Sequence, residues 1–423
     1  MIAALLSSLR CSCTHMYTVL LVPLRFTLIG FAPPNRRKFK AMEYSLYATC
    51  PNEIVNILAE EIEKIGGREI RKAYGVVYFQ ADDTLYYKAH LQLRTASRIF
   101  RIIKDVPAYS PTIIFDKLKR IRFSEFFSHT HPIKINVVIE NKKGNVEGHL
   151  VGSKIREAIT DSFLHFDKVD ANLSSRDPKV LIKGYIHKNR LMLSIDTSLE
   201  ALHRRGFRLD GHPAPLKETL AASLLMLCGY DGNVPFLDPM CGSGTIALEA
   251  AMIACNMAPL SQRGEGRFGF EYLTDFDPNA WKNCLSEVNK RKQPLNIEIF
   301  SRDINESYLE VAKQSFALAG VNSSLIKFEQ KDFFLSKKPV DKGLLVANIP
   351  YGERLEEQDI DVDYLKALGK HLKDNFTGWR CGILMPALAP FQALGVKADK
   401  KFLLHNGKIK VYFLIFDIFS KKK

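Results

Sequence analysis

The stretch VANIPYGERL, residues 346–355, brings together groups that could act on an amine. An apolar run ends at the amide of Asn348, and Pro350 and Tyr351 follow it. The exocyclic amine of a nucleobase is a weak nucleophile, because its lone pair is conjugated with the ring. The Asn348 side-chain carbonyl and a neighbouring backbone carbonyl could accept hydrogen bonds from the amine and stabilise the positive charge that develops when the amine attacks an electrophile. The ring of Tyr351 could stack on the base. Taken alone, these residues fit an ordinary β-turn nearly as well as an active site, and Asn348, Ile349, Pro350 and Tyr351 are candidates for a catalytic set.

A glycine-rich loop lies in VPFLDPMCGSGTIALEAAMIA, residues 234–254. An apolar strand is expected to end at Asp238, a turn follows at Gly242 and Gly244, and a helix is expected from Thr245. Glycines let the backbone turn sharply and approach a ligand closely, and the helix N-terminus offers unpaired N–H groups. Nicotinamide and flavin domains use similar loops. The loop alone therefore predicts a nucleotide cofactor but does not distinguish among the cofactors that such loops bind.

Three acidic residues at the ends of successive expected strands favour S-adenosylmethionine (SAM). A carboxylate at Asp238 would repel a pyrophosphate but pair with the cationic amino-acid part of SAM. Asp303 is placed to accept hydrogen bonds from ribose hydroxyls, and Asp332 to read the adenine amino group. One such residue alone could be a helix cap or a turn residue. The distance from Gly244 to Asp303 exceeds the usual ~20 residues, which predicts an insertion at about 259–294.

The apolar pattern from about residue 197 onward predicts the element type that would position these side chains. Continuous apolar runs alternate with helices, which is typical of a parallel sheet covered on both faces. Near the end, Asn406-Gly407 separates two β-rich runs and predicts an antiparallel hairpin with a type I′ turn. Before residue 197, residues 43–97 predict a strand, helix, strand, helix unit, and residues 98–197 mix basic helices with β-rich runs.

The charge of the chain favours a polyanionic partner. The net charge is +14 and the isoelectric point is near 9.3, which suits a nucleic acid. Basic residues in the first half and after the Tyr351 region could equally be solvated surface charges. The candidates for RNA binding are Arg94, Arg98, Lys119, Arg120, Lys154, Arg156 and Arg354.

The first 41 residues differ from the rest, because no acidic residue precedes Glu43. An organellar presequence, a weak anchor and an extension upstream of a true start at Met42 all fit, and the last is favoured. The apolar stretch from Met16 to Pro34 contains Arg25 and internal prolines, which suits a membrane span poorly. The eight cysteines show no Cys-x-x-Cys pair or zinc spacing. We therefore expect no metal and a reducing, cytoplasmic compartment.

From Met42 onward the chain resembles the THUMP-domain RNA guanine-N2-methyltransferases, in particular the N2-methylating half of a bacterial 23S rRNA enzyme. The matching stretches are ATCPNEIVNILAEEI, LRTASRI, SKIREAITDSF, RRGFRLDGHPAPLKETLAASLL, LDPMCGSGTIALEAA, FGFEYLTDFDPNAW, SRDINE and NIPYGERL. The resemblance implies a ferredoxin-like domain at 42–97, a THUMP RNA-binding domain at 98–197, and a class I, Rossmann-like methyltransferase domain at 198–423 that ends in the antiparallel hairpin.

The resemblance also assigns residues to the cofactor. It implies Asp238, Cys241, Gly242, Gly244 and Thr245 in the SAM loop, Asp303 at the ribose, Asp332 at the adenine, and Lys217, Glu218 and Thr219 on a helix beside the cofactor. Two features depart from the family. The usual Asn-Pro-Pro-Tyr is Asn-Ile-Pro-Tyr here. Larger family members carry a second methyltransferase domain after the first, and this chain stops at Lys423 without one, so the resemblance implies no second methylation activity.

The expected function is therefore SAM-dependent methylation of guanine N2 in RNA, with 23S rRNA favoured. Alternatives that remain open are a tRNA substrate, an amino-methyltransferase acting on DNA or protein, and a non-catalytic RNA-binding protein. An NAD-dependent oxidoreductase is disfavoured by the carboxylate before the glycine loop.

Overall fold

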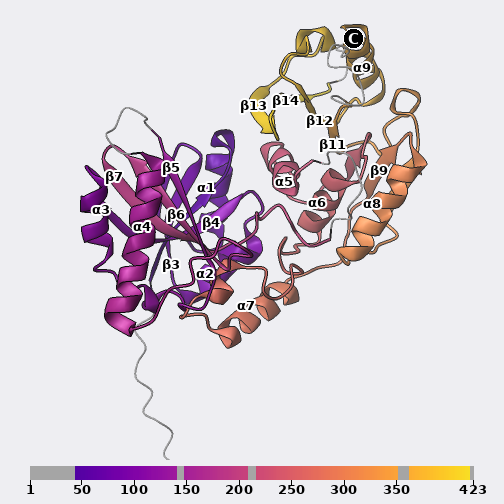
Figure 1. Ribbon diagram of the computed structural model, residues 1–423. Coiled ribbons are helices and arrows are strands. Elements are labelled where there is room, and N and C mark those ends of the chain that lie inside the picture. Colours follow the sequence, from indigo (N-terminus) through magenta and orange to yellow (C-terminus); the bar gives the residue numbers. More distant parts are fainter. Residues whose placement is uncertain (1–42, 141–146, 208–215, 351–361, 420–423) are drawn as a thin grey trace, which may run out of the picture. The chain divides into compact units, whose positions relative to one another are not determined.

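The computed structural model describes residues 43–140, 147–207, 216–350 and 362–419 (Figure 1). The expectations for residues 1–41 lie outside the described residues. Within the described ranges, no helix is long and apolar enough to cross a membrane.

The first half of the described chain builds one seven-stranded sheet. In chain order its elements are β1 (Tyr44–Thr49), α1 (Val55–Lys64), β2 (Arg68–Ala73), β3 (Val76–Ala81), α2 (Asp83–Gln92), β4 (Arg98–Pro107), α3 (Pro111–Leu118), β5 (Ile133–Ile139), α4 (Gly148–Ser162), β6 (Val180–His187) and β7 (Arg190–Asp196). The strand order is β2-β3-β1-β4-β7-β6-β5. A short 3-10 turn (Asn52–Ile54) precedes α1, and Ile54, Leu58 and Ile62 are fully buried at the expected helical spacing.

The edge strand β2 is missing from the sequence-based expectation. Its residues REIRKA are mostly charged and exposed, so they show no apolar alternation. The strand forms through backbone pairing with β3. A pattern of side chains cannot reveal such a strand, because hydrogen bonds rather than burial hold it in place.

The strand β4 joins the two parts of this sheet. It pairs with β1 on one side and with β7 on the other, both antiparallel. Hydrogen bonding therefore runs across the expected boundary between residues 97 and 98. The division into a ferredoxin-like and a THUMP domain at that point remains a prediction.

The second half forms a separate seven-stranded sheet in the order β10-β9-β8-β11-β12-β14-β13. Its strands are β8 (Phe236–Asp238), β9 (Ile299–Asp303), β10 (Ile326–Gln330), β11 (Leu344–Asn348), β12 (Arg380–Pro386), β13 (Lys400–Asn406) and β14 (Ile409–Asp417), and its helices are α5 (Glu218–Leu227), α6 (Thr245–Ala254), α7 (Pro278–Lys290), α8 (Glu306–Leu318) and α9 (Val362–Asn375). The strands from β10 to β12 are parallel and β14 is antiparallel to β12. The expected parallel sheet with a terminal hairpin is confirmed.

The turn of this hairpin differs from the expectation. Asn406 pairs with Ile409, so the two-residue turn is Gly407-Lys408. Gly407 has a φ of +62°, and Lys408 has no positive φ. A type I′ turn needs positive φ at both positions. The expected turn type is therefore wrong, and Gly at the first position alone fits a type II′ turn.

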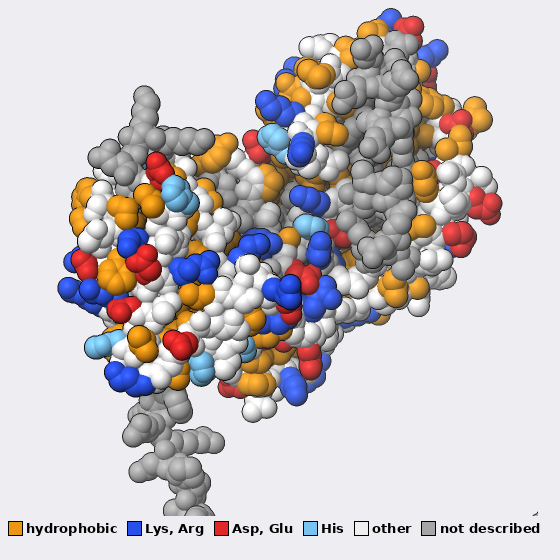
Figure 2. All heavy atoms as spheres, in the orientation of Figure 1, with side chains coloured by type: hydrophobic (Ala, Val, Ile, Leu, Met, Phe, Trp, Pro, Cys, Tyr) orange, Lys and Arg blue, Asp and Glu red, His pale blue; other side chains and the backbone are white. Residues whose placement is uncertain are grey.

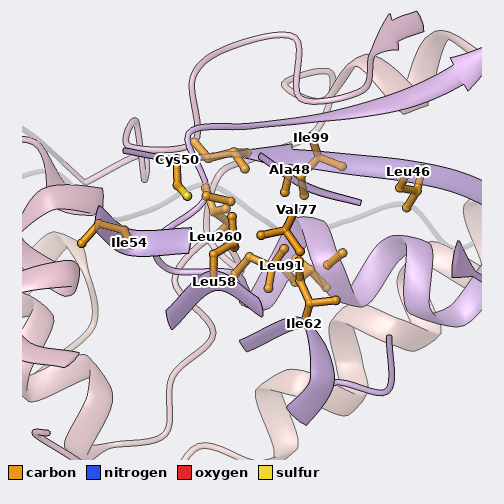
Figure 3. Close-up of a cluster of buried hydrophobic side chains, with 14 of the residues drawn as sticks. Leu46, Ala48, Cys50, Ile54, Leu58, Ile62, Val77, Leu91, Ile99 and Leu260 are labelled. Carbon is orange, nitrogen blue, oxygen red and sulfur yellow. The ribbon is translucent and has the colours of Figure 1, made fainter. Parts of the chain in front are cut away.

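The predicted insertion contains α7 and packs against the first sheet. Figure 3 shows Leu260, from the segment after α6, beside Leu91 at the end of α2. Both side chains are buried, and the Leu260 N–H donates to the Leu91 carbonyl at 3.2 Å. Burying a leucine stabilises a fold by roughly 1.5–3 kcal/mol. The insertion therefore belongs to the shared core rather than to a surface loop.

Candidate functional site

The glycine loop between β8 and α6 has the backbone conformation that its residues allow. Gly242 and Gly244 have φ values of +51° and +74°, in the left-handed region. A Cβ on Gly244 would lie 2.7 Å from the Cβ of Ala312 in α8. The Cys241 N–H donates to the Arg302 carbonyl at 2.8 Å. Glycine at 244 is thus needed for both its backbone conformation and the close packing of α8.

Asp238 ends β8 and is 1% exposed. Its Oδ1 atom has no hydrogen-bond donor within the described part of the chain. Burial raises the pKa of Asp238 well above its usual range, and the charge of Asp303 adds to this, while backbone hydrogen bonds from Met240 and Ala247 lower it. A buried acceptor without a donor is unfavourable unless a ligand supplies one. A cationic ammonium group would do so.

Asp303 ends β9 and holds the glycine loop. Its Oδ2 accepts a hydrogen bond from the Gly242 N–H at 2.8 Å, and its Oδ1 accepts one from the Asn305 N–H at 2.9 Å. A carboxylate has about four acceptor positions, so room remains for the ribose hydroxyls that the sequence predicts there. The sequence pattern did not reveal the contact with Gly242.

Asp332 precedes a short 3-10 helix (Phe333–Leu335) and accepts from the Phe334 N–H at 2.8 Å. It also lines an open pocket of about 300 Å³. The other lining residues are Arg302, Lys331, Leu335, Ser336 and Lys337. Asp332 is therefore both a turn residue and part of an accessible surface, and its contact with adenine remains a prediction.

Tyr364 on α9 is a residue that no sequence motif indicated. Its hydroxyl lies 3.9 Å from the Sδ of Met240 in the glycine loop, and its ring contacts Phe334 at a centroid distance of 5.5 Å. Burial, together with the charge of Asp332, raises the pKa of Tyr364 to about 12. Tyr364 therefore bridges the loops that follow β8 and β10.

Asn348 ends β11, which is parallel to β8 on one side and to β12 on the other. Its Oδ1 is buried and, among the described residues, has no donor. Parallel strands bring their carboxyl ends to the same edge of the sheet, where ligands bind in open α/β folds. Asp238 and Asn348 are thus the last residues of neighbouring strands, and each has a buried acceptor without a donor among the described residues.

Ile349 has a structural role that explains the departure from the usual proline. Its side chain is fully buried in a core cluster with Leu365 and Ile383. Its N–H donates to the Leu384 carbonyl at 3.2 Å, a bond that proline cannot form. Pro350 is half-buried. Tyr351 and Arg354 lie outside the described residues.

The helix α5 carries the three remaining cofactor candidates at its start. Lys217 is exposed at the N-cap position, and Glu218 and Thr219 are buried in the first turn. The helix packs against α6. Their contact with the cofactor remains a prediction.

Arg94 is not available to RNA, which corrects the expectation for this residue. Its side chain is 13% exposed, and its Nη1 lies 3.5 Å from Oε2 of Glu249 in α6. Its Nη2 donates to the carbonyls of Met252 and Met257. Arg205, fully buried, contacts Oε1 of the same glutamate at 3.2 Å. Arg94 therefore ties the residues after α2 to the helix that follows the glycine loop.

The other basic candidates lie nearer the surface. Arg98 is one-third exposed and pairs with Asp196. Lys119 pairs with Asp116 at 2.9 Å, and Lys154 pairs with Glu157 at 2.6 Å. Arg120 and Arg156 are exposed. Lys154 and Arg156 lie on α4, and Lys119 and Arg120 directly follow α3, which packs against α4.

Comparison with known proteins agrees with this geometry. Residues 205–414 match a family model described as "RMKL-like, methyltransferase domain", and residues 45–100 match one described as "RlmL ferredoxin-like domain". A crystal structure of a possible methylase from Clostridium difficile 630 is 31% identical, with a TM-score of 0.81, and the match covers 90% of this chain and 100% of that one. The chain belongs to the RMKL-like methyltransferase family. The expectations of a methyltransferase fold and of a ferredoxin-like domain before it are confirmed.

Two further relatives bear on the cofactor and on the extent of the match. SMU.472, solved in complex with S-adenosylhomocysteine (SAH), is 26% identical with a TM-score of 0.79, over 90% of this chain and 99% of that one. SAH is what remains of SAM after methyl transfer, so the expected cofactor of the family is confirmed. The Ribosomal RNA large subunit methyltransferase K/L of Vibrio campbellii is 33% identical over 86% of this chain. The chain spans about half of the length of that relative, 52%.

Proposed function

We propose that the protein transfers a methyl group from SAM to the exocyclic N2 amine of a guanine in large-subunit ribosomal RNA. The observation that carries this proposal is the buried Asn348 Oδ1 without a donor in the described ranges, at the sheet edge that also holds Asp238. An amine donor of the substrate satisfies this acceptor. The class of RNA follows from the relative in Vibrio campbellii, whose name specifies large-subunit ribosomal RNA.

The described residues fit SAM. Asp238 Oδ1 suits the ammonium of its amino-acid part, and Asp303, beyond its two backbone contacts, has acceptor capacity for ribose hydroxyls. Asp332 and the first turn of α5 complete the proposed binding set. When bound, SAM supplies an electrophilic methyl group on a sulfonium.

The catalytic work of the chain is positioning and charge stabilisation. Asn348 Oδ1 and the backbone carbonyl beside it accept from the guanine amine and orient its lone pair. These acceptors stabilise the positive charge that develops on nitrogen, and the proton leaves after transfer, so no strong base is required. A base inside paired RNA must first be flipped out of the stack.

RNA recognition is proposed for the exposed basic residues of α3 and α4, in the segment that resembles a THUMP domain. Arg120 and Arg156 are exposed there, and Lys119 and Lys154 can exchange their carboxylate partners for phosphates. We place the protein in the cytoplasm.

The test is methylation of defined RNA in vitro. The purified protein, labelled SAM and an unmodified 23S rRNA transcript are incubated, and the digested RNA is examined by mass spectrometry for N2-methylguanosine. We expect this nucleoside, and we expect Asn348→Ala to lower the single-turnover rate at least tenfold while SAH affinity stays unchanged. A tRNA pool and a duplex DNA serve as competing substrates. Methylation of either in preference to rRNA, or a loss below tenfold for Asn348→Ala, contradicts the proposal.

A further inference from the structure

The β13–β14 hairpin and the loops before it form a basic surface that the proposed function does not use. Residues 386–410 hold five lysines and one acidic residue, Asp399. The lysines are all exposed: Lys397, Lys400, Lys401, Lys408 and Lys410. In Figure 2, basic side chains and a histidine lie on the surface where Figure 1 labels β13. The sequence pattern had pointed only to basic residues of other segments.

These lysines differ from the basic residues on α3 and α4. Lys119 and Lys154 each have a carboxylate partner, whereas none of the five hairpin lysines forms an ion pair with a described Asp or Glu. Lys401 instead lies over two rings, with its Nζ 4.5 Å from the Phe391 centroid and 4.7 Å from that of Tyr412. Cations without a carboxylate partner can bind phosphates without first breaking an ion pair.

The strand register brings the hairpin turn to the reaction edge of the sheet. Asn348 pairs with Leu384 of β12, and Leu384 pairs with Phe413 of β14. Lys410 lies three residues before Phe413, beyond the carboxyl end of β12. Two strand spacings and three residue rises give roughly 14 Å between the Cα atoms of Asn348 and Lys410. A strand of RNA whose target base reached Asn348 would pass the hairpin within a few nucleotides.

An exposed leucine stands beside these lysines on a fixed turn. Leu388 is 98% exposed. Its neighbours are held: the Ala387 N–H donates to the Lys410 carbonyl at 2.9 Å, and the Ala389 N–H donates to the Pro386 carbonyl at 3.1 Å. Since these hydrogen bonds hold the backbone on both sides of Leu388, the fold itself exposes the Leu388 side chain. Apolar side chains placed among cations are typical of surfaces that contact both bases and phosphates.

We propose that this hairpin face, defined as Leu388, Lys401, His405, Lys408 and Lys410, binds the RNA strand beside the target guanine. His405 pairs with Lys410 across the hairpin and lies four residues from Lys401, so all three share one face of the ribbon. The lysines neutralise phosphates and Leu388 contacts an unstacked base. The inference rests on the proposed function, because it takes RNA as the substrate.

The experiment compares two triple variants of equal charge. One replaces Lys401, Lys408 and Lys410 by Gln. The matched control replaces Lys290, Lys342 and Lys370, which are also exposed and without an ion pair in the described ranges. RNA affinity is measured against salt concentration with a 23S rRNA transcript. We expect the hairpin variant to bind at least tenfold more weakly and its salt slope to fall by about 2, at ~0.7 per phosphate contact. The control variant should change affinity by less than threefold.

A second pair of variants tests the role of Leu388, the apolar residue of the hairpin face. Leu388→Ser should lower kcat/KM for RNA methylation by fivefold or more with SAH affinity unchanged, and Leu318→Ser, 52% exposed at the end of α8, should not. If the hairpin variant matches its control in affinity and salt slope while the wild-type protein methylates rRNA, the hairpin face does not bind RNA and the proposed function stands. If the wild-type protein neither binds nor methylates rRNA, both the proposed function and the RNA-binding role of the hairpin face are wrong.

Discussion

The carboxylate of Asp303 accepts a hydrogen bond from the backbone N–H of Gly242 at 2.8 Å, so the end of β9 holds the loop that follows β8. A side chain expected to serve the ligand thus also fixes the conformation of the loop.

Replacing Asp303 by Ala should therefore damage cofactor binding in two ways, by removing a ribose acceptor and by releasing Gly242. We expect SAH affinity, measured by calorimetry, to fall at least 30-fold, and stability to fall by about 1–3 kcal/mol, because a partly buried N–H loses its acceptor. Asp303→Asn, which keeps one acceptor oxygen, should lose less of both. Equal SAH affinity in wild type and Asp303→Ala would contradict this role.

Gly244→Ala should destabilise the fold strongly. The left-handed backbone disfavours a side chain, and the new Cβ would lie 2.7 Å from Ala312 Cβ. The control is Gly407→Ala in the hairpin turn, where φ is also positive but nothing lies within 4 Å of the new Cβ. Urea unfolding should show a loss of roughly 1–3 kcal/mol for the control, from its strained backbone alone, and a further 1–3 kcal/mol for Gly244→Ala, from overpacking. Similar losses in the two variants would show that packing against α8 contributes nothing.

The raised pKa of Asp238 predicts how stability and SAH binding depend on pH. The folded protein without ligand holds the proton more tightly than the unfolded chain, so stability falls as pH rises from the usual aspartate pKa through the raised one. Asp238→Asn removes this dependence. The difference in melting temperature between Asp238→Asn and wild type should therefore grow in favour of the variant as pH increases.

Binding should show the opposite trend, since the ammonium of SAH needs the carboxylate. SAH affinity of the wild type should rise over the same pH range, and Asp238→Asn should bind SAH at least tenfold more weakly at neutral pH. For the stability prediction, a difference in melting temperature between Asp238→Asn and wild type that does not change with pH would contradict a raised pKa of Asp238.

Ile349→Pro would restore the usual family motif, yet it should destabilise this protein. Proline cannot donate to the Leu384 carbonyl and leaves part of the buried isoleucine volume empty. We expect a loss of about 2–4 kcal/mol, against about 0.5–1.5 kcal/mol for Ile349→Val, which keeps the N–H. Unfolding by urea measures both. A proline variant as stable as wild type would mean that the loop here already has the conformation that proline imposes.

The sequence predicted the second half of the chain better than the first. Strand-end residues such as Asp238 and Asn348 could be found because a buried parallel strand is a continuous apolar run with a recognisable end. The edge strand β2 could not, because its charged side chains face solvent. The same limit applies to contacts made across the fold. Arg94 meets Glu249, which is distant in the sequence, so its charge looked like that of any surface arginine.

The contact of Arg94 and Arg205 with a single buried glutamate limits how this protein can be divided or recombined. A fragment that begins after residue 197 would keep Glu249 and Arg205 but lose Arg94 and the backbone that Arg205 contacts. Buried charges that lose a partner are strongly destabilising. The two halves are therefore not interchangeable modules, and a chimera with the first half of a relative should fold only if that half brings its own arginine to Glu249.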